Sequence, residues 1–206
     1  HTRTSSFALF VLESFNFDLF DLDIGGRVES VNLKNTSNEK GFFPGAFSST
    51  IKREIFSNNT IFGGFDFTER APNAVELFAN GPHHALEQFE VGDSNMDVET
   101  SYNFSIGYSY NDGLDTLKVE TYYNYIDDFI AADRDGTTTE VEGEDMNNVN
   151  FSQYNALFTG LEVSGQYAFA KINDFDIISN VMIDFLKGYR NSNDKALSRI
   201  PQTKMN

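Results

Sequence analysis

The chain has 206 residues with 15 Lys and Arg against 31 Asp and Glu, so its formal net charge is −16. This acidic balance argues against nucleic-acid binding, which requires a basic face, and the lack of Cys excludes disulfides and thiolate metal sites. No stretch approaches the ~18 consecutive apolar residues that a membrane helix requires, which excludes a helical membrane protein.

Alternation of apolar and polar residues is the main pattern along the chain, and it predicts β-strands. Between Tyr102 and Tyr110, for example, Phe104 and Ile106 share one face and Asn103 lies on the other. In chain order we predict strands at 5–15, 17–33, 42–53, 58–69, 101–111, 114–131, 151–170 and 174–189, with a ninth beginning near 199.

Two predicted strands alternate less cleanly, because Phe10 in 5–15 and Phe62 in 58–69 fall on the face that carries the polar residues. Several glycines also lie inside predicted strands, where they indicate bends or close backbone contacts in a curved sheet. These glycines are Gly63, Gly64, Gly107, Gly160 and Gly165.

The connections between the predicted strands alternate between short and long. We expect short turns near Asn16, Ser57, Asp112 and Asn173. The longer loops are expected at 34–41, 70–100, 132–150 and 190–198. Short turns at one end and long loops at the other are typical of an up-and-down outer-membrane barrel, whereas a soluble Greek-key sandwich has no reason to collect its long loops at one end.

The composition agrees with such a barrel. The chain has 21 Phe and 9 Tyr, which favour strands and the bilayer interfaces of barrels. Its mean hydropathy of −0.38 is low, as expected where polar residues face a lumen and apolar ones face outer-membrane lipid. We therefore predict an all-β fold, an antiparallel up-and-down transmembrane β-barrel that is partial. Closure would require strands from outside this sequence, because an open edge in lipid leaves backbone groups unpaired.

The predicted loop at 70–100 holds the best candidate metal ligands. Imidazole and carboxylate groups together suit borderline divalent metals such as zinc. Adjacent histidines in an extended chain point to opposite sides, so one of the pair would bind at a time. The competing interpretation is a structured loop whose histidines pack or form hydrogen bonds. The candidate ligands are His83, His84, Glu87, Glu90 and Asp93.

The predicted loop at 132–150 is rich in carboxylates, and we expect it to be solvated and mobile rather than a calcium loop, because the spacing does not end in a convincing bidentate Glu. Its carboxylates are Asp133, Asp135, Glu140, Glu142, Glu144 and Asp145. No phosphate-binding glycine motif and no nucleophile elbow is present. The sequence therefore predicts neither an enzyme nor a resident cofactor.

The loop at 70–100 carries a family resemblance. Arg70-Ala71-Pro72 followed by Glu76-Leu77, and then the stretch 95–101 that enters the next strand, resemble TonB-dependent outer-membrane receptors. In the family pattern Met96 stands where Leu is usual and Val98 where Pro is usual, while Glu99 and Ser101 stand where expected. The form Gly81-Pro82-His83-His84 is most similar to the branch of zinc-uptake receptors, and 199–201 resembles the segment that opens a late barrel strand in this branch.

The resemblance implies a bacterial outer-membrane barrel of about 22 strands with a plugged lumen. It implies that residues 1–206 are the C-terminal half of the barrel domain, without the N-terminal plug, the segment that contacts TonB, or the last strands. It further implies uptake of a scarce ligand with energy relayed by TonB, and a role for His83 or His84 in handling a metal. The ligand stays open between zinc, an iron–siderophore complex, haem and cobalamin.

Two other functions remain open at this stage. A passive porin or structural barrel would need neither a plug nor a TonB-contacting segment. A secreted, soluble β-protein that binds glycans would not partition into the outer membrane.

Overall fold

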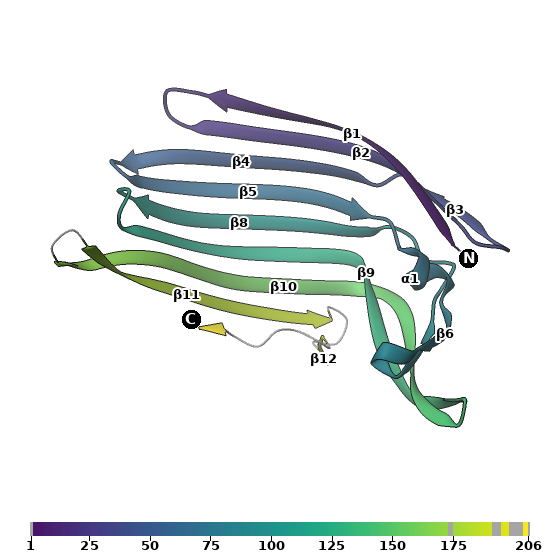
Figure 1. The fold of residues 1–206 in the computed structure, drawn as a ribbon. Helices are drawn as coiled ribbons and strands as arrows, with labels where there is room; N and C mark the ends of the chain where they lie inside the picture. Colours follow the sequence, from purple (N-terminus) through teal and green to yellow (C-terminus); the bar gives the residue numbers. More distant parts are fainter. Residues whose placement is uncertain (1, 173–174, 191–194, 198–203, 206) are drawn as a thin grey trace.

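The chain folds almost entirely as antiparallel β-structure in a computed structural model that describes residues 2–172, 175–190, 195–197 and 204–205. Among these residues thirteen strands join one sheet. Eight long strands lie side by side and form what we call the wall (Figure 1). They are β1 (Arg3–Asn16), β2 (Asp21–Lys34), β4 (Gly45–Phe56), β5 (Asn59–Arg70), β8 (Glu99–Asn111), β9 (Thr116–Val141), β10 (Glu144–Ile172) and β11 (Phe175–Arg190).

The remaining elements are short, and most of them lie at one end of the wall, which we call the rim (Figure 1). Among the described residues, no helix has the length and apolar character to cross a membrane. The short elements are β3 (Glu39–Phe42), α1 (Ala74–Phe78), β6 (Asn80–His83), the 3-10 turn η1 (His84–Leu86), β7 (Gln88–Val91), β12 (Lys195–Ala196) and β13 (Lys204–Met205).

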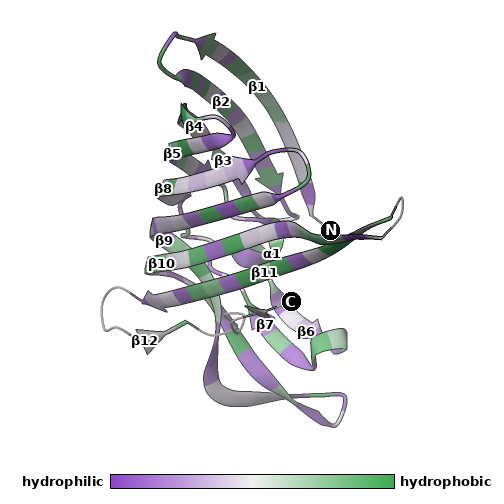
Figure 2. Ribbon diagram, turned by 90° about the vertical axis from the view of Figure 1, so that its left-hand side faces the viewer, coloured by the Kyte–Doolittle hydropathy of each residue, from purple (hydrophilic) through white to green (hydrophobic). Residues whose placement is uncertain are grey.

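Each wall strand pairs with the next in chain order, as predicted for an up-and-down barrel. Phe104 of β8 lies between Phe65 of β5 and Tyr123 of β9, and Leu161 of β10 lies between Thr121 and Phe185. This register places the predicted apolar residues together on one face, and Figure 2 shows apolar and polar residues alternating along the strands. The prediction of the fold and of its two faces is confirmed.

The apolar face has no second layer over it in the described part of the chain. Phe104 is 54% exposed, Ile106 65% and Leu161 40%. Rings meet across strands on this face, as in the Phe65–Phe104 pair, whose centroids are 4.8 Å apart. These side chains therefore do not form the dry core of a soluble protein. An exposed apolar surface of this size indicates that something apolar covers this face.

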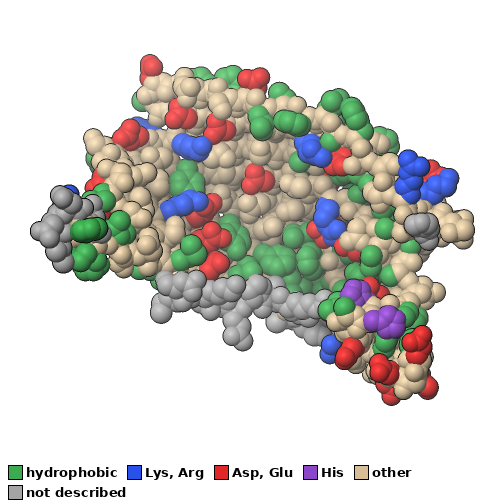
Figure 3. Space-filling model, in the orientation of Figure 1, with side chains coloured by type: hydrophobic (Ala, Val, Ile, Leu, Met, Phe, Trp, Pro, Cys, Tyr) green, Lys and Arg blue, Asp and Glu red, His purple; other side chains and the backbone are tan. Residues whose placement is uncertain are grey.

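The opposite, polar face carries charged side chains across the middle of the wall (Figure 3). It includes the Lys52–Asp23 ion pair at 2.7 Å and the Lys118–Glu120 pair at 2.7 Å. Phe62 also lies on this face, as predicted, with the Lys118 ammonium 5.3 Å from its ring centroid.

Two glycines on the polar face accept aromatic rings from the strand beside them. A Cβ on Gly107 would stand 2.3 Å from Cζ of Phe62, and one on Gly160 would stand 2.3 Å from Cζ of Tyr122. In both cases glycine and ring are direct cross-strand partners. The predicted close contacts at these glycines are thus ring-to-backbone contacts within the sheet.

Two of the predicted long loops are instead extended hairpins. Half of the segment 34–41 is strand, because β2 continues to Lys34, a turn fills 35–38 and β3 pairs back onto β2. The segment 132–150, predicted to be a loop, is also a strand hairpin, because β9 continues to Val141 and β10 begins at Glu144. The sequence pattern did not reveal these extensions, because most of their residues are polar and the alternation of apolar and polar residues is lost.

The predicted loop at 70–100 contains α1, the hairpin of β6 and β7, and η1 rather than irregular chain alone. The turn predicted near Asn173 and the start of the ninth strand near 199 lie outside the described residues. At the far edge, β13 pairs with β11.

Candidate functional site

The rim is organised around Arg70, the last residue of β5. Its guanidinium donates from Nη1 to both carboxylate oxygens of Glu76, at 3.1 and 3.0 Å. It also donates to Glu99 of β8, from Nε at 3.2 Å and from Nη2 at 3.1 Å. The backbone amide of Ile130 on β9 donates to the same Glu99 carboxylate at 2.8 Å. One arginine thus joins β5, α1, β8 and, through Glu99, β9.

Helix α1 begins with a capping box that also uses Glu76. The side-chain oxygen of Asn73 accepts from the amides of Val75 and Glu76, at 2.8 and 3.0 Å. The Glu76 carboxylate in turn accepts from the Asn73 amide at 2.7 Å. This reciprocal arrangement satisfies the free amides at the helix start and fixes the carboxylate that Arg70 contacts.

The chain after the β6–β7 hairpin returns directly against α1. The Asp93 amide donates to the Glu76 carbonyl at 2.9 Å, and the Gly92 amide donates to the Ala79 carbonyl at 2.8 Å. A Cβ on Gly92 would stand 2.7 Å from the Glu76 carbonyl oxygen and 2.8 Å from backbone atoms of the next two residues. Glycine is therefore required here for close backbone approach.

A small apolar core lies under these contacts at the rim. It joins residues from β2, β3, α1, the chain after β7, and β9, so it draws on three separate connections. Its members are Leu33, Phe42, Leu77, Met96 and Ile130, each less than 9% exposed. Pro72 is also fully buried. The rim connections therefore pack on one another rather than standing apart as independent loops.

The five predicted metal ligands all belong to the β6–β7 hairpin and its return. His83 ends β6, His84 begins η1, Glu87 caps η1 with a positive φ of 51°, and Glu90 lies in β7. The Asp93 carboxylate accepts from the Asn95 amide at 2.8 Å. Figure 3 shows histidines exposed at the projecting end of the rim.

Across the described residues, no three His, Asp or Glu side chains stand close enough together to hold a metal ion. The metal site therefore stays a prediction for His83, His84, Glu87, Glu90 and Asp93. With these side chains where they lie, a metal bound by a histidine would need further ligands from outside this set.

The acidic hairpin formed by the ends of β9 and β10 is held by side-chain hydrogen bonds. Asp135 accepts from the Thr137 hydroxyl at 2.6 Å, from the Thr137 amide at 2.8 Å and from the Asn150 amide group at 3.0 Å. These bonds, led by the Thr137 hydroxyl, lower the pKa of Asp135 below its ordinary value. Glu142 and Gly143, with φ of 53° and 87°, form a tight turn at the tip.

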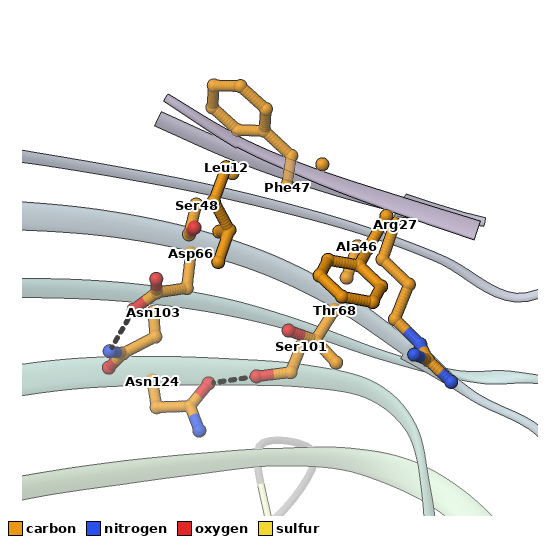
Figure 4. A pocket seen from close by; sticks show the side chains of 13 residues that line it. Leu12, Arg27, Ala46, Phe47, Ser48, Asp66, Thr68, Ser101, Asn103 and Asn124 are labelled. Carbon is orange, nitrogen blue, oxygen red and sulfur yellow. Dashed lines mark hydrogen bonds between the residues drawn. The ribbon is translucent and has the colours of Figure 1, made fainter. Parts of the chain in front are cut away.

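The polar face of the wall holds an open groove of ≈ 630 Å³ (Figure 4). Asn103 donates to Asp66 at 3.2 Å, and the Ser101 hydroxyl donates to Asn124 at 2.7 Å. Phe10 and Leu12 of β1 form an apolar side of the groove. Phe10 therefore lies on the polar face, as predicted for it and for Phe62. The groove can offer hydrogen bonds and an aromatic ring to a bound molecule.

The whole chain, residues 1–206, matches the family described as TonB dependent receptor-like, beta-barrel. The chain belongs to this family. The resemblance drawn from Arg70-Ala71-Pro72 and Glu99 is thereby confirmed at the level of the family, and this family match does not distinguish the zinc-uptake branch.

Solved receptors share the fold at low identity. The copper transporter OprC superposes with a TM-score of 0.79 over 99% of this chain and 31% of that one, at 17% identity. The FrpB iron transporter from Neisseria meningitidis gives 0.65 over 96% and 28%, at 15% identity. The alcaligin receptor FauA from Bordetella pertussis gives 0.64 over 99% and 33%, at 11% identity. The chain thus spans about a third or less of the length of these receptors.

The structure explains what the family motif does in this TonB-dependent receptor chain. Arg70 and Glu99 are joined by a bidentate ion pair, Pro72 and Met96 are buried, and Ser101 bonds across to β9. The motif therefore has a structural role: its ion pair, hydrogen bond and buried residues attach the rim to the wall. Replacing the usual Leu with Met96 keeps an apolar side chain in the core.

Sequence reasoning missed three parts of this arrangement. The capping box was readable from Asn73 followed three residues later by Glu76. The close approach at Gly92 depends on where the returning chain passes α1, which no local pattern gives. The contacts of Gln153, described below, depend on a bulge in β9 opposite β10, which no local pattern gives either.

We predict that Arg70→Ala loosens the rim. It would leave the Glu76 and Glu99 carboxylates, whose side chains are 11% and 14% exposed, without their cation. Losing one partner of a buried pair costs ~3–5 kcal/mol. Because the guanidinium is 42% exposed, we expect roughly 2–3 kcal/mol less stability against local opening of 71–98. Hydrogen exchange of amides in 71–98 of the intact receptor measures this free energy of local opening.

The control is Arg27→Ala, which removes the exposed Arg27–Glu29 ion pair on β2. We expect this change to cost less than about 1 kcal/mol. Equal effects of the two substitutions on exchange in 71–98 would show that Arg70 has no special role at the rim.

Proposed function

We propose that this chain forms wall strands and extracellular connections of an outer-membrane receptor that imports a scarce metal or metal chelate with energy relayed by TonB. The observation that carries the proposal is the two-faced single-layer wall, with its apolar face uncovered and its packed connections gathered at one end. Family membership and the fold shared with OprC, FrpB and FauA support it.

In this proposal the apolar face contacts outer-membrane lipid, because a barrel exposes its apolar residues to the hydrocarbon. The short turns at 17–20, 57–58 and 112–115 would face the periplasm, and the rim would face the exterior. The polar face would line the lumen and contact the receptor's own N-terminal plug. The plug, the TonB-contacting segment and the last strands would lie in sequence outside these 206 residues.

The ligand class is proposed as zinc, an iron–siderophore complex or haem. The exposed His83 and His84 on a projecting hairpin support a metal-containing ligand, since imidazole binds borderline divalent ions. The shared fold with solved structures named as copper and iron transporters and as an alcaligin receptor supports the same class.

The orientation of the wall can be tested with one pair of neighbouring residues. Phe104→Arg would place a cation on the apolar face near the middle of β8. We expect it to cost about 2–4 kcal/mol of unfolding free energy in lipid vesicles. Asn103→Arg places the same group on the polar face beside Asp66, where we expect less than about 1 kcal/mol. The opposite ranking in denaturant titrations would reverse the assignment of the faces.

Transport can be tested in a strain that lacks the intact receptor. We expect growth under zinc or iron limitation to fall in the deletion strain and to return with the receptor gene, but only where TonB is present. Restoration without TonB would favour a passive porin. Recovery of the intact protein in the aqueous phase rather than the outer-membrane fraction would favour a secreted glycan-binding protein.

The histidine prediction needs a separate measurement. In the intact receptor, we expect His83→Ala/His84→Ala to weaken Zn²⁺ binding at least about tenfold, because imidazole donors would be lost. Leu86→Ala is the matched control, since Leu86 is exposed on the same hairpin. Unchanged zinc affinity in the double variant, measured by calorimetry, would remove these residues from the site without affecting the transport proposal.

A further inference from the structure

Two connections that are separate in sequence meet at the rim in one sheet. The strand β7 pairs in parallel with β10, with Gln88 opposite Asn147 and Val91 opposite Asn150. The strand β6 lies outside β7, and the end of β9 lies on the other side of β10. The resulting order β6–β7–β10–β9 defines what we call the rim sheet.

The rim sheet leaves the wall at a bulge in β9. Asn155 of β10 stands opposite two residues of β9, Asp127 and Asp128, because the register shifts between Tyr154 and Ala156. Asp128 has a φ of 53°, and its amide donates to the Asn155 side chain at 3.3 Å. A bulge bends the strand that contains it and increases the local twist, and Figure 1 shows β9 and β10 turning together near the rim.

Gln153 joins the bulge to the other connection. Its side-chain oxygen accepts from the Asp97 amide at 3.0 Å, and its amide group donates to the Asp97 carbonyl at 2.9 Å. The same amide group donates to the Asp128 carbonyl at 3.1 Å. One side chain therefore bonds the chain that returns from β7 and the bulge that carries β9 and β10.

Burial supports the same connection. Gln88 of β7 is 5% exposed, and Met146 and Val149 of β10 are 3% and 1% exposed. The pKa of Asp128 is raised, first by burial and then by the nearby Asp127 and Asp97 carboxylates.

We propose that the connection 71–98 and the hairpin 128–153 form one rigid body, and that Gln153 is the positioning residue that locks them together. A ligand held on the β6–β7 hairpin would then act on the β9–β10 hairpin as well. That last consequence rests on the proposed function, whereas the rigid body itself does not.

Hydrogen exchange of the full-length receptor in lipid nanodiscs tests the lock without any ligand. Gln153→Ala removes three hydrogen bonds, so we expect amides in 80–91 and in 138–150 to exchange faster by the same factor, at least about tenfold. Exchange in 101–110 of the wall should not change. Acceleration in 80–91 alone, or in neither segment, would overturn the proposal.

The matched control is Gln166→Ala on the same strand, where the Gln166 amide group donates to the Leu114 carbonyl at the far end of the wall at 2.9 Å. It should leave exchange in both rim segments unchanged. The same acceleration from Gln166→Ala would show a general loss of stability rather than release of a lock.

A second measurement keeps Gln153 in place. Spin labels attached through Leu86→Cys and Glu142→Cys would report the distance between the two hairpin tips by pulsed electron resonance, after replacement of any cysteine outside this Cys-free sequence. One rigid body gives a single narrow distance distribution, which broadens in Gln153→Ala. A broad or split distribution with Gln153 present would mean two independent connections.

Discussion

Backbone pairing within a single layer is the constraint on which this structure depends. The wall has no second sheet above either face in the described part of the chain, so its strands are held by pairing with their neighbours and by side chains that meet across strands. Such a sheet can be apolar on one side only if that side meets an apolar medium. The rings of Phe104 and its neighbours are exposed on this face, and an uncovered apolar patch of this kind favours association in water.

Conventional packing is concentrated at the rim. There a few buried side chains from distant connections form a core, and Arg70 satisfies two carboxylates that would otherwise be buried without a cation. Removing charge from both partners together would cost less than removing one, because the penalty comes from the unpaired group. The family motif thus attaches long connections to a wall that is one layer thick. This role explains why it combines Arg, Pro, Glu and apolar residues.

Sequence alone predicted the wall well, because alternation with a period of two is strong where one face is apolar. It also identified Phe10 and Phe62 as exceptions on the polar face. It failed where that contrast weakens: the ends of β9 and β10 are mostly polar, with few apolar residues and no regular alternation, and were predicted to be a loop. The pairing of β7 with β10 joins residues about 60 positions apart, as in Asn147 with Gln88, and no local pattern encodes it. The metal prediction rested on residue types, which say nothing of the distances between side chains.

The two ring-on-glycine contacts of the polar face bear on how much room the barrel encloses. Phe62 and Tyr122 are bulky, yet each lies along the neighbouring backbone at Gly107 or Gly160 instead of standing upright. An aromatic side chain laid flat adds little thickness to its side of the wall. The polar face is therefore lower at these strands than a list of its residues would suggest.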